Sequence, residues 1–166
     1  GKASEREFEF NKRNERSISL FSGGLDSLAG VKWLVDAGRK PLLVSHQPGG
    51  LVSGVQEELI EELRKRLDQL EWYQIRAAAV GGSGLAEKES TQLSRSFLYL
   101  TLGSVFALQL GIDTVHIFEN GVLALNIPLT QSRVYSNTRT AHPVFLLNYE
   151  TLLAGLFGQH VAIRNP

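Results

Sequence analysis

Residues Ser22 to Ser27 read Ser-Gly-Gly-Leu-Asp-Ser, a composition suited to binding phosphate. The adjacent glycines Gly23 and Gly24 let the backbone turn sharply and allow an anionic group to come close. The hydroxyls of Ser22 and Ser27, with the free N–H groups of a following helix, would point at that group, and the helix dipole would favour its charge. The carboxylate of Asp26 makes sense beside a phosphate chiefly if Mg²⁺ or a backbone N–H mediates. The turn therefore predicts a phosphate site.

A buried strand and a helix are expected on either side of this turn. Residues 18–21 form a short apolar run that is typical of a buried parallel strand, and residues 28–35 predict a helix packed back on the sheet. The common phosphate loop is excluded because no Gly-Lys-Ser or Gly-Lys-Thr follows, and adjacent glycines do not fit the spacing of a dinucleotide fingerprint. A glycine-rich turn with no ligand stays open as the alternative.

Strands and helices alternate along the rest of the chain. Residues 41–46, 74–80 and 114–118 predict strands, and residues 55–70 and about 90–110 predict helices, with Gly38 and Gly111 ending the helices before them. The apolar stripe of the helix over 55–70 consists of Val55, Leu59, Leu63, Leu67 and Leu70. This alternation predicts an α/β fold with a doubly wound, mostly parallel sheet of about five strands and helices on both faces.

Polar residues follow two of the predicted strands at the edge where a parallel sheet presents ligand contacts. Ser45 and His46 end the strand over 41–46, and we expect them to contact a nucleotide, although a satisfied surface histidine is an equally good interpretation of His46. Three residues follow the strand over 114–118: Glu119, Asn120 and Gly121. Glu119 is a hydrogen-bond acceptor, Asn120 is both donor and acceptor, and Gly121 permits a close approach of the backbone.

A long polar segment with little regular pattern continues from there, and it contains Arg133, Arg139 and His142. Long polar loops that begin at a ligand edge are more often functional than structural. The alternative is a surface excursion in which both arginines merely pair with carboxylates.

Composition limits the class of protein. The chain has 166 residues, a formal net charge of +0 and no cysteine. One domain is expected, with no electrostatic footprint for nucleic acid, no disulfide and no cysteine-based zinc site. No transmembrane run or signal peptide is visible, so a cytoplasmic location is the expectation. Because methionine is absent even at position 1, the start looks like a cloning junction or an internal start, and we expect a fragment of a longer protein.

The predicted domain organisation has two parts. Residues 1–16 form a polar lead-in with a possible edge strand over residues 7–10, and residues 17–166 form one nucleotide-binding domain that is truncated at its carboxyl end.

The Ser22–Ser27 turn resembles the signature of the PP-loop ATP pyrophosphatases, which split ATP between the α and β phosphates and transfer AMP to a substrate. Later segments resemble one branch of that family, the 7-cyano-7-deazaguanine synthase-like proteins, and within it the divergent members found in bacterial antiviral defence operons. The closer resemblance is carried by residues 95–98, 119–121, 124–129 and 138–143.

The resemblance implies ATP-dependent, AMP-forming activation of a 7-deazaguanine carboxylate, followed by amide and nitrile formation or by conjugation to a protein amine. It implies that ATP and Mg²⁺ bind at Ser22, Gly23, Gly24, Leu25, Asp26 and Ser27, with Asp26 on the metal. Its implied substrate-binding residues are Arg95, Glu119, Asn120, Gly121, Arg133, Thr138, Arg139 and Thr140. Its implied catalytic residues are Asp26, Arg95, Arg139 and His142.

His142 is expected to serve as the general base for an attacking amine, since its pKa class suits that role, whereas a His-Pro pair that shapes a turn is the structural alternative. The standard synthases also carry a four-cysteine zinc site near the carboxyl end. Either that segment lies beyond residue 166 or this branch lacks it, so no zinc site is expected within this chain.

Two other functions stay open. One is a non-catalytic nucleotide-binding subunit of a defence complex, and the other is a PP-loop enzyme that modifies transfer RNA, which the neutral charge disfavours. The expected partners are a 7-deazaguanine-type small molecule and either a protein acceptor or other subunits encoded in a defence operon. Membrane and nucleic acid are not expected as partners.

Overall fold

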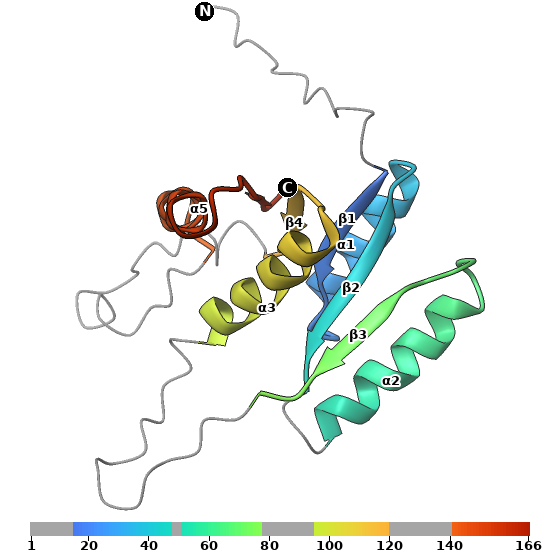
Figure 1. The fold of residues 1–166 in the computed structure, drawn as a ribbon. Coiled ribbons are helices and arrows are strands. Elements are labelled where there is room, and N and C mark those ends of the chain that lie inside the picture. Colours follow the sequence, from blue (N-terminus) through green and yellow to red (C-terminus); the bar gives the residue numbers. More distant parts are fainter. Residues whose placement is uncertain (1–14, 48–50, 78–94, 120–140) are drawn as a thin grey trace, which may run out of the picture.

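The structure is a computed structural model that describes residues 15–47, 51–77, 95–119 and 141–166 (Figure 1). Strands and helices alternate within these ranges. In chain order they are β1 (Arg16–Leu20), α1 (Leu25–Asp36), β2 (Lys40–His46), α2 (Leu51–Arg64), β3 (Trp72–Ile75), α3 (Arg95–Leu110), β4 (Thr114–His116), α5 (Pro143–Phe157) and β5 (Ala162–Arg164).

The strands form one five-stranded sheet in the order β3-β2-β1-β4-β5, and every pairing is parallel. From β1 the chain moves outward through β2 to β3 and then returns to place β4 on the other side of β1 (Figure 1). Ile18 of β1 lies in register between Leu42 of β2 and Val115 of β4. The predicted α/β fold with a parallel sheet of five strands is confirmed.

Helices cover both faces of the sheet, with α1 and α2 on one side and α3 and α5 on the other (Figure 1). Residues of β1 alternate between these sides because successive side chains of a strand point in opposite directions. Ile18 and Leu20 join the apolar cluster under α3 and α5, whereas Phe21 joins a smaller cluster under α1 and α2. Helix α3 approaches the sheet closely at Gly103, where an added Cβ would lie 2.6 Å from Leu20 Cδ2.

Helices α1 and α3 end at the glycines predicted for them. Gly38 and Gly111 have φ angles of 72° and 63°, in the left-handed region that glycine adopts without strain. The N–H of Gly38 donates to the carbonyl of Val35 at 2.9 Å, which satisfies one of the free carbonyls at the end of α1.

The predicted course of α2 is wrong in two respects. The helix spans Leu51–Arg64 rather than residues 55–70, and Val55 of the predicted buried stripe is exposed. The residues of α2 that are buried are Ser53, Gln56 and Ile60. The rest of the predicted stripe, Leu59, Leu63, Leu67 and Leu70, packs against the apolar cluster on this side of the sheet. At the start of the helix the buried position is taken instead by a polar side chain, Gln56, that hydrogen-bonds the backbone beneath it.

Several other boundaries also differ from the predictions. Strand β3 begins at Trp72 and ends at Ile75, short of the predicted residue 80, and residues 78–80 lie outside the described ranges. Strand β1 begins at Arg16 and β4 ends at His116, so Phe21 and Phe118 both lie just past their strands. The predictions did not include α5 or β5, and the possible edge strand over residues 7–10 is outside the description.

Among the described residues, no helix combines the length and the apolar character needed to cross a membrane.

Candidate functional site

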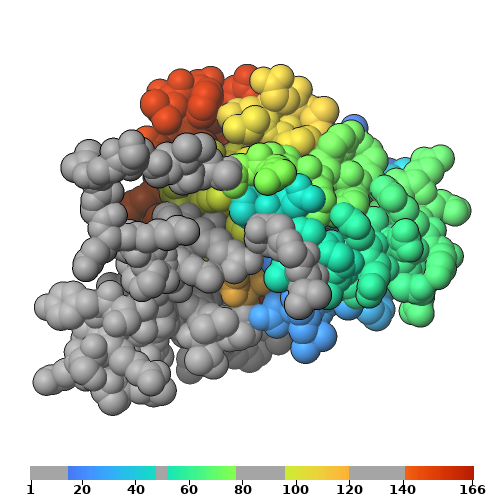
Figure 2. Space-filling model, turned by 90° about the horizontal axis from the view of Figure 1, so that it is seen from below, coloured from blue at the N-terminus to red at the C-terminus, as the bar shows by residue number. Residues whose placement is uncertain are grey.

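The candidate site lies where the carboxyl ends of β1 and β4 meet. The chain leaves β1 toward one edge of the sheet and leaves β4 toward the other, which makes this pair of strands the topological switch point where open α/β sheets bind ligands. Figure 2 views the molecule from this end of the strands, with the blue atoms of the β1–α1 segment beside those of α2. A pocket of about 280 Å³ is lined here by Leu20, Ser22, Ser27, Ser96, Tyr99, Ile117, Phe118 and Glu119.

The turn between β1 and α1 has the geometry expected for an anion site. Gly23 has a φ of 83°, and Gly24, with φ −84° and ψ 166°, caps α1 without help from a side chain. Since α1 begins at Leu25 and its first helical bond is donated by the N–H of Leu28, the N–H groups of residues 25–27 have no partner within the helix. Such N–H groups at the positive end of a helix dipole attract anions.

Two serine hydroxyls fix the shape of this turn. The Ser22 hydroxyl accepts a hydrogen bond from the N–H of Gly24 at 3.3 Å and donates to Ser27 Oγ, also at 3.3 Å. The Ser27 hydroxyl donates to the carbonyl of Gly24 at 2.8 Å. Both serines line the pocket, as the predicted phosphate site requires.

The segment after β4 is positioned by aromatic packing on α1. The ring of Phe118 lies over Gly30, where an added Cβ would come within 2.1 Å of the ring. Trp33 contacts the same ring edge-on with centroids 6.2 Å apart, and His116 stacks on it at 5.9 Å. Glu119 follows directly and faces the pocket.

Two acidic side chains influence each other in this part of the molecule. Burial raises the pKa of Glu119, and the negative charge of Asp26 raises it further. Glu119 lines the pocket and Asp26 lies in the first turn of α1, so each side of the switch point carries one carboxylate. Among the described residues, no group of three or more histidine, aspartate or glutamate side chains could hold a metal alone. Mg²⁺ is commonly held by one or two carboxylates together with substrate phosphates, so this pair fits the ion.

The structure places Ser45 and His46 behind the turn and outside the pocket lining. The fully buried Ser45 hydroxyl donates to the carbonyl of Phe21 at 2.6 Å and accepts from Trp72 Nε1 at 2.9 Å. His46 Nε2 lies 2.9 Å from the carbonyl oxygen of Ala77, and the ring contacts pocket-lining Tyr99 edge-on at 5.7 Å. In this geometry Ser45 supports the turn, and His46 contacts the pocket wall.

The remaining predicted residues are only partly described. Arg95 is the first residue of α3, next to the pocket-lining Ser96, and Leu25 is the exposed first residue of α1. His142 caps α5, where its Nδ1 accepts a hydrogen bond from the N–H of Val144 at 3.2 Å, so only Nε2 remains for a role as a base. The other predicted site residues, Asn120, Gly121, Arg133, Thr138, Arg139 and Thr140, lie outside the described ranges.

Two residues of the site were not predicted, Gln56 and Asn165. Gln56 of α2 holds the Ser22–Ser27 turn by donating a hydrogen bond to the carbonyl of Ser22. Asn165 fixes the backbone of Glu119 from the end of β5, since its Oδ1 accepts from the N–H of Glu119 at 3.0 Å and its Nδ2 donates to the Glu119 carbonyl at 3.2 Å. The position of Asn165 directly after a strand, at the ligand edge of the sheet, was the available sequence signal.

A scan of the chain against protein-family models finds no match, and a search of curated proteins finds none either.

Proposed function

We propose that this chain is a PP-loop ATP pyrophosphatase-type ligase that activates a 7-deazaguanine carboxylate as an acyl-adenylate. The observation that carries the proposal is the Ser22–Ser27 turn, whose glycines, serines and helix N-terminus lie beside a pocket at the switch point of a parallel sheet. This combination suits the phosphates of a nucleotide better than it suits an uncharged ligand.

In the proposed complex, the N–H groups of residues 25–27 and the hydroxyls of Ser22 and Ser27 bind the ATP phosphates. Asp26 and Glu119 would hold Mg²⁺ with those phosphates, and the fit is supported by the place of Glu119 in the pocket lining and of Asp26 in the first turn of α1. When bound, Mg²⁺ supplies neutralisation of the charge that develops on pyrophosphate.

The reaction requires little covalent chemistry from the protein. A carboxylate oxygen of the substrate forms a bond to the α-phosphorus, the bond from that phosphorus to the bridging oxygen breaks, and pyrophosphate leaves. An amine then attacks the acyl carbon, AMP leaves, and the amine proton passes to a base, for which His142 Nε2 is the candidate. The protein contributes mainly by holding the reacting atoms together and by placing N–H dipoles where charge develops.

The apolar part of the pocket supports a planar heterocycle as the second substrate. Tyr99, Ile117 and Phe118 supply apolar and aromatic surface, and Glu119 supplies a hydrogen-bonding group at the same place. Flat apolar walls with a few convergent polar groups are typical of sites for ring systems such as a deazapurine.

A second candidate, a nucleotide-binding subunit of a defence complex, is favoured by the outer face of α5. Val144, Leu147 and Leu152 lie on one side of this helix and are 59%, 62% and 48% exposed, and a contiguous exposed apolar patch of this kind can mark a surface that contacts a partner. In this case ATP binds without being cleaved.

The test is the release of AMP and pyrophosphate from ATP by the longest available form of the protein, with and without 7-carboxy-7-deazaguanine. The proposal predicts AMP and pyrophosphate in equal amounts and only with the deazapurine. ATP binding with no AMP under either condition would support the non-catalytic subunit. Formation of ADP and phosphate would contradict both.

A further inference from the structure

The side chain of Gln56 is fully buried between α2 and the phosphate turn. Its Nε2 donates to the carbonyl of Ser22 at 2.9 Å and to the carbonyl of His46 at 3.4 Å. Its Oε1 accepts from Nε2 of Gln74 at 2.9 Å. One amide therefore connects the turn, the end of β2 and the side of β3.

The aliphatic part of Gln56 also packs on the turn. Its Cγ lies 2.9 Å from the position that a Cβ would take on Gly23, the residue with φ 83°. The contact packs α2 against Gly23, the position of the turn where a residue with a side chain would be strained.

The direction of these hydrogen bonds determines which way the turn presents its N–H groups. In a planar trans peptide, the C=O and the following N–H point in opposite directions. With the Ser22 carbonyl held toward Gln56, the N–H of Gly23 points away from α2. In the preceding peptide, the Ser45 hydroxyl holds the Phe21 carbonyl in the same way and directs the N–H of Ser22. Carbonyl oxygens, which would repel an anion, are thus kept on the inner side of the turn.

We infer that Gln56 is a positioning residue that holds the Ser22–Gly23 peptide in the orientation that binds phosphate. This inference rests on the proposed function, because it assigns the support of the same phosphate turn. Because residues 23 and 24 are both glycine, the peptide planes of the turn can adopt several orientations. A hydrogen bond from outside the turn is therefore needed to select one of them.

The experiment compares the binding of ATP with Mg²⁺, of inorganic pyrophosphate and of adenosine by titration calorimetry. Gln56→Leu removes the donor and the acceptor with little change in volume. Gln56→Glu keeps an acceptor for Gln74 but faces the Ser22 and His46 carbonyls with oxygen instead of N–H. The inference predicts that both variants weaken ATP and pyrophosphate binding about tenfold and leave adenosine binding unchanged.

Two matched controls separate positioning from general damage to α2. Ser53→Ala changes a buried residue on the same face of α2, and Gln74→Leu removes the bond to β3 but leaves the Gln56–Ser22 bond. Both should bind ATP within about twofold of wild type. Thermal unfolding of each variant fixes a titration temperature at which all are folded, so that a loss of stability alone cannot lower the affinity.

Each outcome bears on a different claim. Unchanged phosphate affinity in Gln56→Leu, or wild-type behaviour of Gln56→Glu, would overturn the positioning role while the ATP proposal stands. Equal losses for adenosine and ATP would also overturn it, because the effect would then not be specific to phosphate. If the wild-type protein binds pyrophosphate but not ATP, the proposed function is contradicted. The pyrophosphate affinities of the Gln56 variants then still test the positioning role. Binding of neither would contradict both claims.

Discussion

The two faces of the sheet are built from different kinds of residue. Under α3 and α5, the positions facing the helices are apolar, as at Ile18, Leu20 and Val115. Under α1 and α2, the buried positions include a series of polar side chains and a small apolar cluster. The buried polar residues on this side include Ser17, Ser19, Ser27, Ser45, Ser53, Gln56 and His116.

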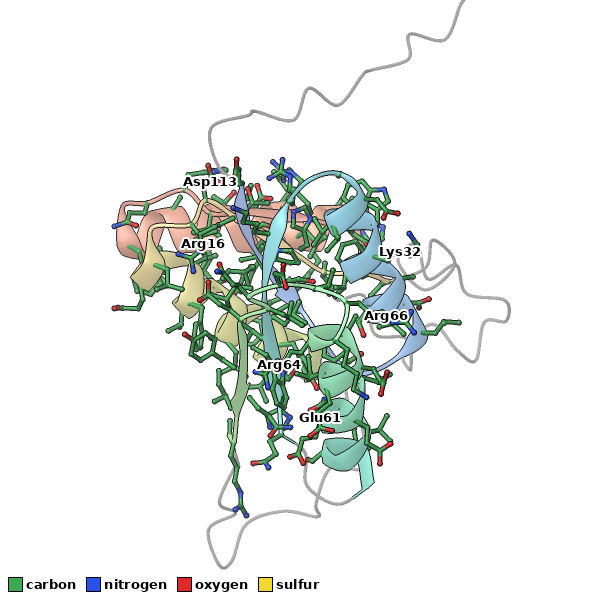
Figure 3. All side chains as sticks on the ribbon, turned by 90° about the vertical axis from the view of Figure 1, so that its right-hand side faces the viewer. Arg16, Lys32, Glu61, Arg64, Arg66 and Asp113 are labelled. Atoms are coloured by element: carbon green, nitrogen blue, oxygen red, sulfur yellow. The ribbon has the colours of Figure 1, made fainter. Side chains whose placement is uncertain are left out.

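Charge on the outer surface follows the same division. Lys32, Glu61, Arg64 and Arg66 are exposed on the side of α1 and α2, which faces the viewer in Figure 3. Helix α5 contains one charged residue, Glu150, which is buried and bonded to Arg164 at 2.8 Å.

The comparison indicates a division of roles. Burial of a polar group is costly unless it is hydrogen-bonded, and burial of apolar surface is the main stabilising contribution. Ser45 and Gln56 are buried where they hydrogen-bond the backbone of Phe21 and Ser22, so part of the polar face supports the candidate site. The apolar face supplies the stability that offsets their burial. The following predictions test this division, in order of decreasing effect.

Asp26→Asn should lower AMP formation by about a thousandfold, because a neutral amide removes one of the two carboxylates proposed to hold Mg²⁺. The free energy of unfolding should be unchanged or slightly higher, since the repulsion with Glu119 is also removed. Steady-state turnover and urea unfolding measure the two quantities. Full activity in this variant would refute the metal role of Asp26.

Leu100→Ala should lower the free energy of unfolding by about 3 kcal/mol, because Leu100 of α3 is fully buried against the sheet and the truncation leaves a cavity. ATP affinity should stay within about twofold of wild type at a temperature where the variant is folded. A large loss of ATP affinity without a loss of stability would contradict the proposed division of roles, because the apolar face would then support the site rather than the stability of the fold.

His116 should make the α1–α2 side sensitive to acid. Burial, together with the smaller effects of the positive charges of Arg39 and Arg164, lowers the pKa of His116 to about 4. The unfolded chain, with an ordinary histidine pKa near 6.5, takes up the proton first as the pH falls, so stability is lost between pH 6.5 and 4. The loss amounts to about 3 kcal/mol.

The variant His116→Phe keeps the ring contacts with Trp33 and Phe118 and removes the titrating group. Urea unfolding at several pH values should show a shallower pH dependence below pH 6.5 for this variant than for wild type. Identical pH profiles for the two proteins would show that His116 is not the source of the acid sensitivity.

Asn165→Ala should have the smallest effect of the four, a loss of about 1 kcal/mol in unfolding free energy, because two partly buried hydrogen bonds to Glu119 are removed. The more informative readout is the pair of KM values for MgATP and for the deazapurine, both of which should rise several-fold, because Glu119 is proposed to contact the metal and the heterocycle. A loss of stability with both KM values unchanged would show that Asn165 does not act through Glu119.

Local patterns predicted the parts of the fold that depend on local chemistry. The apolar run before Ser22, the glycine turn and the glycine ends of α1 and α3 each reflect a preference of nearby residues, and the structure has them where they were predicted. Parallel pairing followed from the alternation of strands and helices. Helix α5 is apolar on nearly all sides, and its few polar residues include Asn148, Glu150 and Thr151. Such a sequence has no amphipathic pattern from which a helix could be predicted.

The residues that support the site could not be predicted because their contacts are distant in sequence. Gln56 bonds Ser22, which lies 34 residues earlier, and Asn165 bonds Glu119 across 46 residues. In a helix with several charged residues, a single glutamine looks like one more solvated side chain. Its burial depends on which face of α2 meets the sheet, and the apolar stripe gave that face correctly at Leu59 and Leu63 and incorrectly only at the exposed Val55.

The most direct test of the central claim is a crystal structure of the protein with α,β-methylene-ATP and Mg²⁺. The account predicts phosphate oxygens within hydrogen-bonding distance of the N–H groups of residues 25–27, with Asp26 facing the metal. A nucleotide bound away from the carboxyl ends of β1 and β4, or phosphates that do not contact the Ser22–Ser27 turn, would contradict it.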